Sequence, residues 1–249
     1  MKQRMFLIAC GLLCGIAARA QEAVPLSRDE SGAYKKKLVG VLEAIGDAPA
    51  GYAKERENFT LPTEAYPART TGAFEPVSAG VTRSYGTDKA VSRSQEDLAK
   101  DYQKRIADAQ AKGDYEAISK MTSEMQLKMS QANANALSAH KEPVEVDIRL
   151  NAFGAATIDP DAVVVEKPGF IGLREKPDES SDIGTVTIYC DPVTLKDTKQ
   201  LSAVRLQPPA GGMKKVEVRT IQVRFHGPLK EVEPWVKSID GKKLLAQFN

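Results

Sequence analysis

The sequence predicts an α+β fold: a mainly antiparallel C-terminal sheet with covering helices, preceded by an inserted α-helical hairpin. Helical periodicity runs through residues 92–140 and is interrupted once, at Lys112-Gly113-Asp114. Residues 141–249 contain short runs in which apolar and polar residues alternate, as in strands with one buried face, and they close with a helical pattern. Residues 21–249 are expected to form one domain.

Residues 1–20 have the composition of a secretory signal peptide. Lys2 and Arg4 give a basic start, an apolar stretch follows, and Ala18-Arg19-Ala20 fits the small-x-small cleavage pattern. We therefore expect cleavage near Ala20 and a periplasmic or secreted mature chain without a transmembrane segment.

A lipoprotein is the less favoured alternative. Leu7-Ile8-Ala9-Cys10 spells a lipid-attachment box, with Cys10 as the acceptor. Its apolar stretch would be only about five residues long, shorter than the region that a signal peptide normally requires.

The charge balance disfavours nucleic acid as a partner. The full chain has 35 Lys and Arg against 33 Asp and Glu, and cleavage would remove Lys2, Arg4 and Arg19. Binding to phosphate backbones or anionic membranes requires a basic field. The partner is therefore expected to be a protein or another component of the cell envelope.

After residues 1–20, residues 21–91 contain an N-terminal helix and an extended, Pro-containing segment. The helix is expected at 31–45, where Tyr34, Leu38 and Val41 share one face. Periodicity is weak between residues 47 and 90, but five aromatic side chains suggest an ordered segment. These form the candidate partner-binding surface: Tyr52, Phe59, Tyr66, Phe74 and Tyr85. Plain packing on the rest of the protein is the alternative.

The hairpin at 92–140 contains the candidate metal site. In the second helix, Met121, Met125 and Met129 recur every four residues and share one face. Thioethers are soft ligands that suit Cu(I). The alternative is that methionine fills irregular space between the helices, and no cofactor is predicted.

Residues 141–249 are expected to be β-rich and to end in a helix. Strands are predicted at 144–151, 162–166, 169–174, 185–190, 201–206 and 215–225, and the helix at 228–239. In the strand at 215–225 the apolar positions change parity near Thr220, which suggests a β-bulge. Cys190 shares the aliphatic side of its strand with Val186 and Ile188, so a buried, unreactive thiol is expected.

The sequence lacks the motifs of well-known enzymes. It contains neither a Gly-x-Ser-x-Gly nucleophile elbow nor a Gly-x-x-x-x-Gly-Lys phosphate loop. A Cys190–His226 pair is conceivable because both residues close predicted strands. An enzyme built from scattered residues would need a polar cleft with His226 or paired carboxylates.

We therefore expect an exported, non-enzymatic envelope protein that binds another protein or a cell-envelope component. A small-ligand or copper carrier, and an enzyme without a recognisable motif, are the alternatives.

Overall fold

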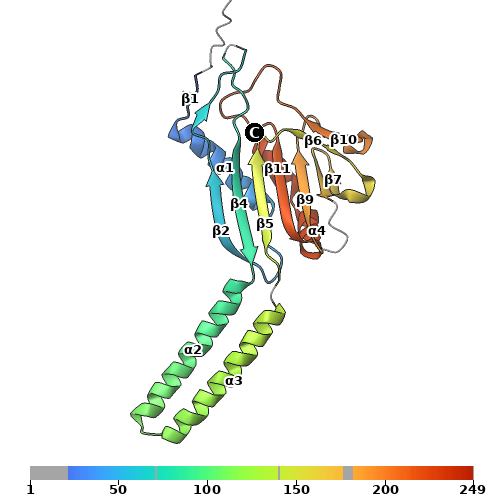
Figure 1. The fold of residues 1–249 in the computed structure, drawn as a ribbon. Helices are drawn as coiled ribbons and strands as arrows, with labels where there is room; N and C mark the ends of the chain where they lie inside the picture. The colour runs from blue at the N-terminus through green and yellow to red at the C-terminus, as the bar shows by residue number, and fades with distance from the viewer. Residues whose placement is uncertain (1–21, 71, 140, 176–181, 249) are drawn as a thin grey trace, which may run out of the picture.

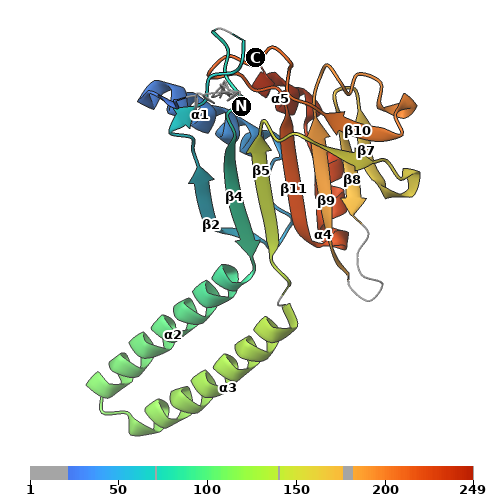
Figure 2. The same ribbon diagram turned by 45° about the horizontal axis from the view of Figure 1, so that its top comes forward.

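The computed structural model describes residues 22–70, 72–139, 141–175 and 182–248. They form a broad antiparallel sheet with helices on one face and a helical hairpin that projects from one end (Figures 1 and 2). The predicted α+β class is therefore confirmed. The expected signal peptide and lipid-attachment box lie outside the described residues.

The main sheet has seven strands in the order β2-β4-β5-β11-β9-β8-β7, and every neighbouring pair is antiparallel. The strands are β2 (Ala53–Thr60), β4 (Ala79–Gly86), β5 (Val144–Leu150), β7 (Val163–Lys167), β8 (Phe170–Glu175), β9 (Ile183–Cys190) and β11 (Ile221–Pro228).

Two strands of this sheet precede the hairpin, in the segment that the sequence suggested was merely extended. The strand β2 forms one edge, and charged residues fill Lys54 to Glu57. Such charges are usual on edge strands, where they discourage pairing with other chains, but they erase the apolar alternation. In β4, Gly80 and Gly86 weaken the same signal.

Three helices cover one face of the sheet: α1 (Arg28–Ala44), α4 (Leu229–Ser238) and α5 (Gly241–Leu245). Helix α1 begins three residues earlier than expected because Ser27 and Glu30 form a capping box. The main core lies between these helices and the inward side chains of the central strands. Within it, the Trp235 ring meets the rings of Tyr85 and Phe225 edge-on, each with a centroid distance of 5.2 Å.

A small second sheet caps part of the opposite face. It pairs β6 (Gly154–Thr157) with β10 (Ala203–Leu206). A separate apolar cluster packs Val204 and Leu206 of β10 with Leu195 and with Ile171 and Leu173 of β8. The 3-10 turns η1 (Pro160–Ala162), η2 (Thr198–Gln200) and η3 (Ala246–Phe248) complete the chain.

The predicted strand at 215–225 is only half right, and the predicted β-bulge is wrong. Strand β11 begins at Ile221, and residues 215–220 form an irregular segment. Buried Asn151 accounts for this: its side-chain amide donates to Glu217 O at 2.8 Å, and its side-chain oxygen accepts from Arg219 N at 2.7 Å. These bonds occupy backbone groups that a strand ladder would use.

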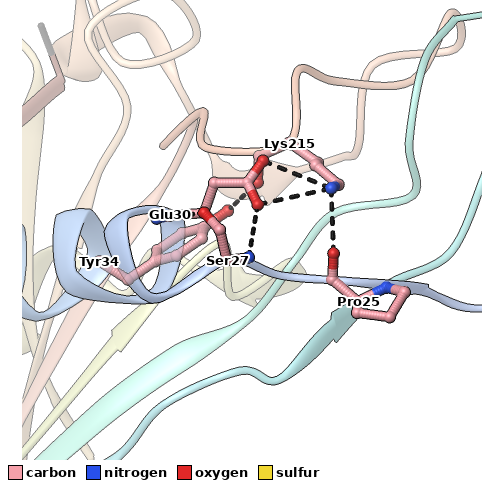
Figure 3. A network of polar contacts seen from close by, with 5 residues as sticks. All are labelled: Pro25, Ser27, Glu30, Tyr34 and Lys215. Atoms are coloured by element: carbon pink, nitrogen blue, oxygen red, sulfur yellow. Dashed lines mark hydrogen bonds and ion pairs between the residues drawn. The ribbon is translucent and has the colours of Figure 1, made fainter.

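The beginning of the described chain is tied to the same irregular segment (Figure 3). β1 (Val24–Pro25) pairs with β3 (Glu64–Ala65). Lys215 Nζ then donates to Pro25 O at 3.1 Å and lies 3.4 Å from the Glu30 carboxylate, while Tyr34 Oη donates to Lys215 O at 2.9 Å. Helix α1 is thereby joined to the connection that precedes β11.

The hairpin consists of α2 (Asp88–Ala111) and α3 (Tyr115–Ala139), and Gly113 between them adopts a φ of 69°. The buried Tyr102 ring of α2 lies close to one cation from each helix. Arg105 of α2 is 5.0 Å and Lys128 of α3 is 5.6 Å from the ring centroid. Of the helices within the described ranges, none is both long and apolar enough to cross a membrane.

Candidate functional site

The candidate site is the open face of the main sheet, which we define as the face opposite α1, α4 and α5. Figure 1 looks onto this face, with α1 and α4 behind the strands. Along β5, Val144, Val146 and Ile148 are buried in the main core, whereas Glu145 and Arg149 are exposed on the opposite side. The period of two in each strand thus separates an apolar layer from a polar one.

The strand register arranges the open face in three rungs, each running across β2, β4, β5, β11 and β9. The rung nearest the hairpin contains Arg56, Ser84, Glu145, His226 and Thr185. The middle rung contains Asn58, Thr82, Asp147, Arg224 and Thr187. The far rung contains Thr60, Gly80, Arg149, Gln222 and Tyr189.

Two shallow depressions occupy the rung nearest the hairpin and its surroundings. One, of 320 Å³, is lined by Glu145, Asp147, Arg149, Arg224 and His226. The other, of 290 Å³, is lined by Arg56, Asn58, Thr82, Ser84 and Glu145. Small-molecule sites are usually concave and mainly apolar, whereas these depressions are lined by polar side chains.

Most charges of the open face are paired within it. Arg149 Nε donates to Asp147 at 2.9 Å, and Arg224 lies 3.5 Å from Glu175 of β8. The side chains of Arg149 and Arg224 remain 60% and 51% exposed. Both guanidinium groups therefore remain accessible to a partner while their own pairs hold them in place.

Arg56 and Glu145 differ from these residues. Both are exposed, and neither side chain forms a hydrogen bond or an ion pair with another residue in the part of the chain that the structure describes. They flank Ser84 in the rung nearest the hairpin. Two opposite charges thus stand unneutralised on either side of a hydroxyl group.

The conceivable Cys190–His226 pair is excluded. Cys190 is fully buried in the main core, so its expected burial is confirmed, and this burial strongly raises the pKa of its thiol. His226 lies on the open face, where its Nδ1 is 3.1 Å from Thr185 Oγ1. The two side chains face opposite sides of the sheet, so His226 cannot act as the base that activates the thiol.

The five predicted partner-binding rings do not form one surface. Tyr85 is 4% exposed and packs on Trp235, so its role as a contact ring is corrected. Tyr52, Phe59 and Phe74 are half-buried against the main core, as the plain-packing alternative describes. Tyr66 alone among the five is exposed, at 48%. The three half-buried rings thus anchor β2 and its flanking connections to the main core.

The predicted metal ligands Met121, Met125 and Met129 lie half-buried along α3. This burial fits packing within the hairpin, where methionine fills uneven space. Cysteine and histidine could complete such a site. The described residues contain one of each, Cys190 and His226, and both lie in the main sheet. The structure thus does not bring them to the methionines.

Sequence reasoning missed the open face as a site, although part of its signal was visible. The alternation of Glu145, Asp147 and Arg149 with buried residues marks a polar side of one strand. Nothing in that local pattern identifies β11 and β4 as the neighbours. Comparison with protein-family models, curated proteins and solved structures finds no match for the chain.

Proposed function

We propose that this is an exported, non-enzymatic binding protein that docks a partner protein on the open face of its sheet. The observation that carries the proposal is the contrast between the two faces. One is sealed by three helices over an apolar core, and the other carries three rungs of charged, hydroxyl and amide side chains, which are accessible on β2, β4, β5 and β11 but buried at Thr185 and Thr187 of β9. Export is inferred from the sequence of residues 1–20.

A protein fits this face better than a small ligand does. Protein interfaces are broad, and arginine is enriched among the residues that contribute most to binding. Arg149 of β5 and Arg224 of β11 lie on neighbouring strands at the centre of the face. The side chain of each is partly exposed. The polar rungs around them supply hydrogen-bonding groups for a partner's surface.

The size of the face sets a further condition. Five strands about 4.8 Å apart and three rungs about 6.8 Å apart cover roughly 19 by 14 Å. A standard interface buries about 800 Å² on each partner, more than this area provides. The partner is therefore expected to extend onto a neighbouring element, either the base of the hairpin or the β6–β10 pair.

Site-specific photocrosslinking in cells of the native organism tests the proposal. A benzophenone amino acid at Gln222, on the far rung, should give a discrete protein adduct, and one at Lys36, exposed on α1, should not. Replacing Arg149 and Arg224 together by alanine should reduce the Gln222 adduct about tenfold. Equal adducts from both positions, or none from Gln222, would refute docking on this face. A polysaccharide adduct would refute a protein as the partner.

A further inference from the structure

We infer that the subsite between Arg56 and Glu145 binds an acidic and a basic side chain of one extended segment of the partner. This inference rests on the proposed function and names the chemistry that one part of the open face recognises. The acidic side chain lies against Arg56, and the basic side chain lies against Glu145.

The register places the two charges on either side of a hydroxyl-lined floor. Arg56 pairs across the ladder with Ser84, and Ser84 pairs with Glu145. The depression of 290 Å³ between them is also lined by Thr82 and Asn58. Two strand spacings separate the Cα atoms of Arg56 and Glu145, a distance of about 9.6 Å.

The pairing pattern of the open face singles out these two charges. Asp147 is paired with Arg149, and Arg224 with Glu175. Among the charged carboxylates and guanidinium groups of the three rungs, Arg56 and Glu145 are the two whose side chains lack such a partner within the described residues. A segment of one charge sign would be attracted by one of them and repelled by the other, whereas a segment with both signs satisfies the pair.

An extended polypeptide has suitable dimensions. Alternate side chains of a strand point to the same side and lie about 6.8 Å apart. The flexible side chains of Glu and Lys at such positions can span the remaining distance to charges about 9.6 Å apart. The Thr82 and Ser84 hydroxyls and the Asn58 amide then face the backbone of the segment, for which they supply donors and acceptors.

Amide NMR of the isotope-labelled mature chain, titrated with capped tripeptides, tests this inference. The probes are acetyl-Glu-Gly-Lys-amide, acetyl-Lys-Gly-Lys-amide and acetyl-Glu-Gly-Glu-amide. We expect the Glu/Lys peptide to bind wild type best and to move the amide signals of Thr82 and Ser84. Arg56→Glu should change the preference to the Lys/Lys peptide, and Glu145→Arg to the Glu/Glu peptide, each by about tenfold.

Matched reversals on the exposed surface of α1 are the controls. Arg28→Glu and Glu43→Arg should leave the peptide preference unchanged. If the three peptides bind wild type equally, or if the reversals at positions 56 and 145 leave the preference unchanged, the subsite inference is wrong. The Gln222 adduct is read separately, so a failed peptide preference with a positive adduct overturns the subsite and leaves the proposed function in place.

Discussion

The indole Nε1 of Trp235 donates a buried hydrogen bond of 2.8 Å to the backbone oxygen of Ile45. Ile45 is the residue that ends α1, and Trp235 lies in α4, 190 positions later. The bond satisfies a helix-terminal carbonyl that has no partner within its own helix. It therefore fixes the relative position of two helices that cover the same face of the sheet.

Trp235→Phe should lower the free energy of unfolding by about 2–4 kcal/mol, because it leaves the Ile45 carbonyl unsatisfied and opens a gap beside Tyr85 and Phe225. Urea denaturation followed by circular dichroism measures the change. Tyr115→Phe, at a position 81% exposed, is the control and should change stability by less than about 0.5 kcal/mol. A Trp235→Phe variant as stable as wild type would show that this bond does not hold the helices together.

Asn151→Asp should destabilise the contact between the end of β5 and the irregular segment that precedes β11. Asn151 has a φ of 56°, which Asp also tolerates, so the backbone requirement is preserved. The substitution replaces a donor to Val77 O and Glu217 O, both at 2.8 Å, with an acceptor that is only 5% exposed. We expect the free energy of unfolding to fall by about 2–4 kcal/mol, as measured by urea denaturation at neutral pH.

The same chemical change on the open face is the control for Asn151→Asp. Asn58 is exposed, so Asn58→Asp should be close to neutral. Similar effects at both positions would mean that added negative charge, and not the lost donor, explains the Asn151 result.

Protein stability should fall between pH 10 and pH 12 in a manner that depends on Tyr34. Burial, followed by the nearby charges of Glu217 and Glu30, raises the pKa of Tyr34 from 10.0 to about 12. Between these values the unfolded state has lost the phenolic proton while the folded state retains it, so rising pH favours unfolding. The free energy of unfolding that protonated Tyr34 contributes is fully present below pH 10. It is lost progressively as the pH rises, by about 2 kcal/mol near pH 12.

Tyr34→Phe isolates this effect from lysine titration in the same range. The variant loses the hydrogen bond to Lys215 O at all pH values, so its stability should be lower at pH 8. Between pH 10 and pH 12 its stability should decline less than that of wild type in urea denaturation. Parallel declines in the two proteins would mean that Tyr34 does not titrate differently in the folded state.

Local sequence patterns predicted those parts of the fold that depend on one segment at a time. The alternation that buries Val146 and exposes Glu145 fixes the two faces of β5, and the same reasoning correctly buried Cys190. It failed at Val216 and Val218, which look like strand residues, because hydrogen bonds from distant Asn151 hold that segment in an irregular conformation.

The open face required information that no single segment contains. Arg56 and Glu145 are 89 positions apart in sequence but are separated in space by one strand, because β2, β4 and β5 are neighbours. Arg56 also lies beside a register shift between Lys54 and Arg56, which decides the side of the sheet on which it projects. Neither the strand order nor this shift follows from residue periodicity.

Removal of the helical hairpin should leave the body of the protein folded. Strands β4 and β5 are direct antiparallel neighbours, with Tyr85 opposite Val144, so a short turn can join them. The two helices pack chiefly on each other, and both views show them extending beyond the end of the sheet (Figures 1 and 2).

The test variant replaces residues 89–140 with an Asn-Gly turn and keeps Lys141, whose Nζ lies 2.8 Å from Glu231 of α4. The shortened chain should unfold cooperatively within about 1 kcal/mol of wild type, since the length of a closed loop changes stability only weakly. Urea denaturation followed by tryptophan fluorescence reports on this directly, because Trp235 lies in the main core. Loss of the cooperative transition would instead mean that the body of the protein requires the hairpin in order to fold.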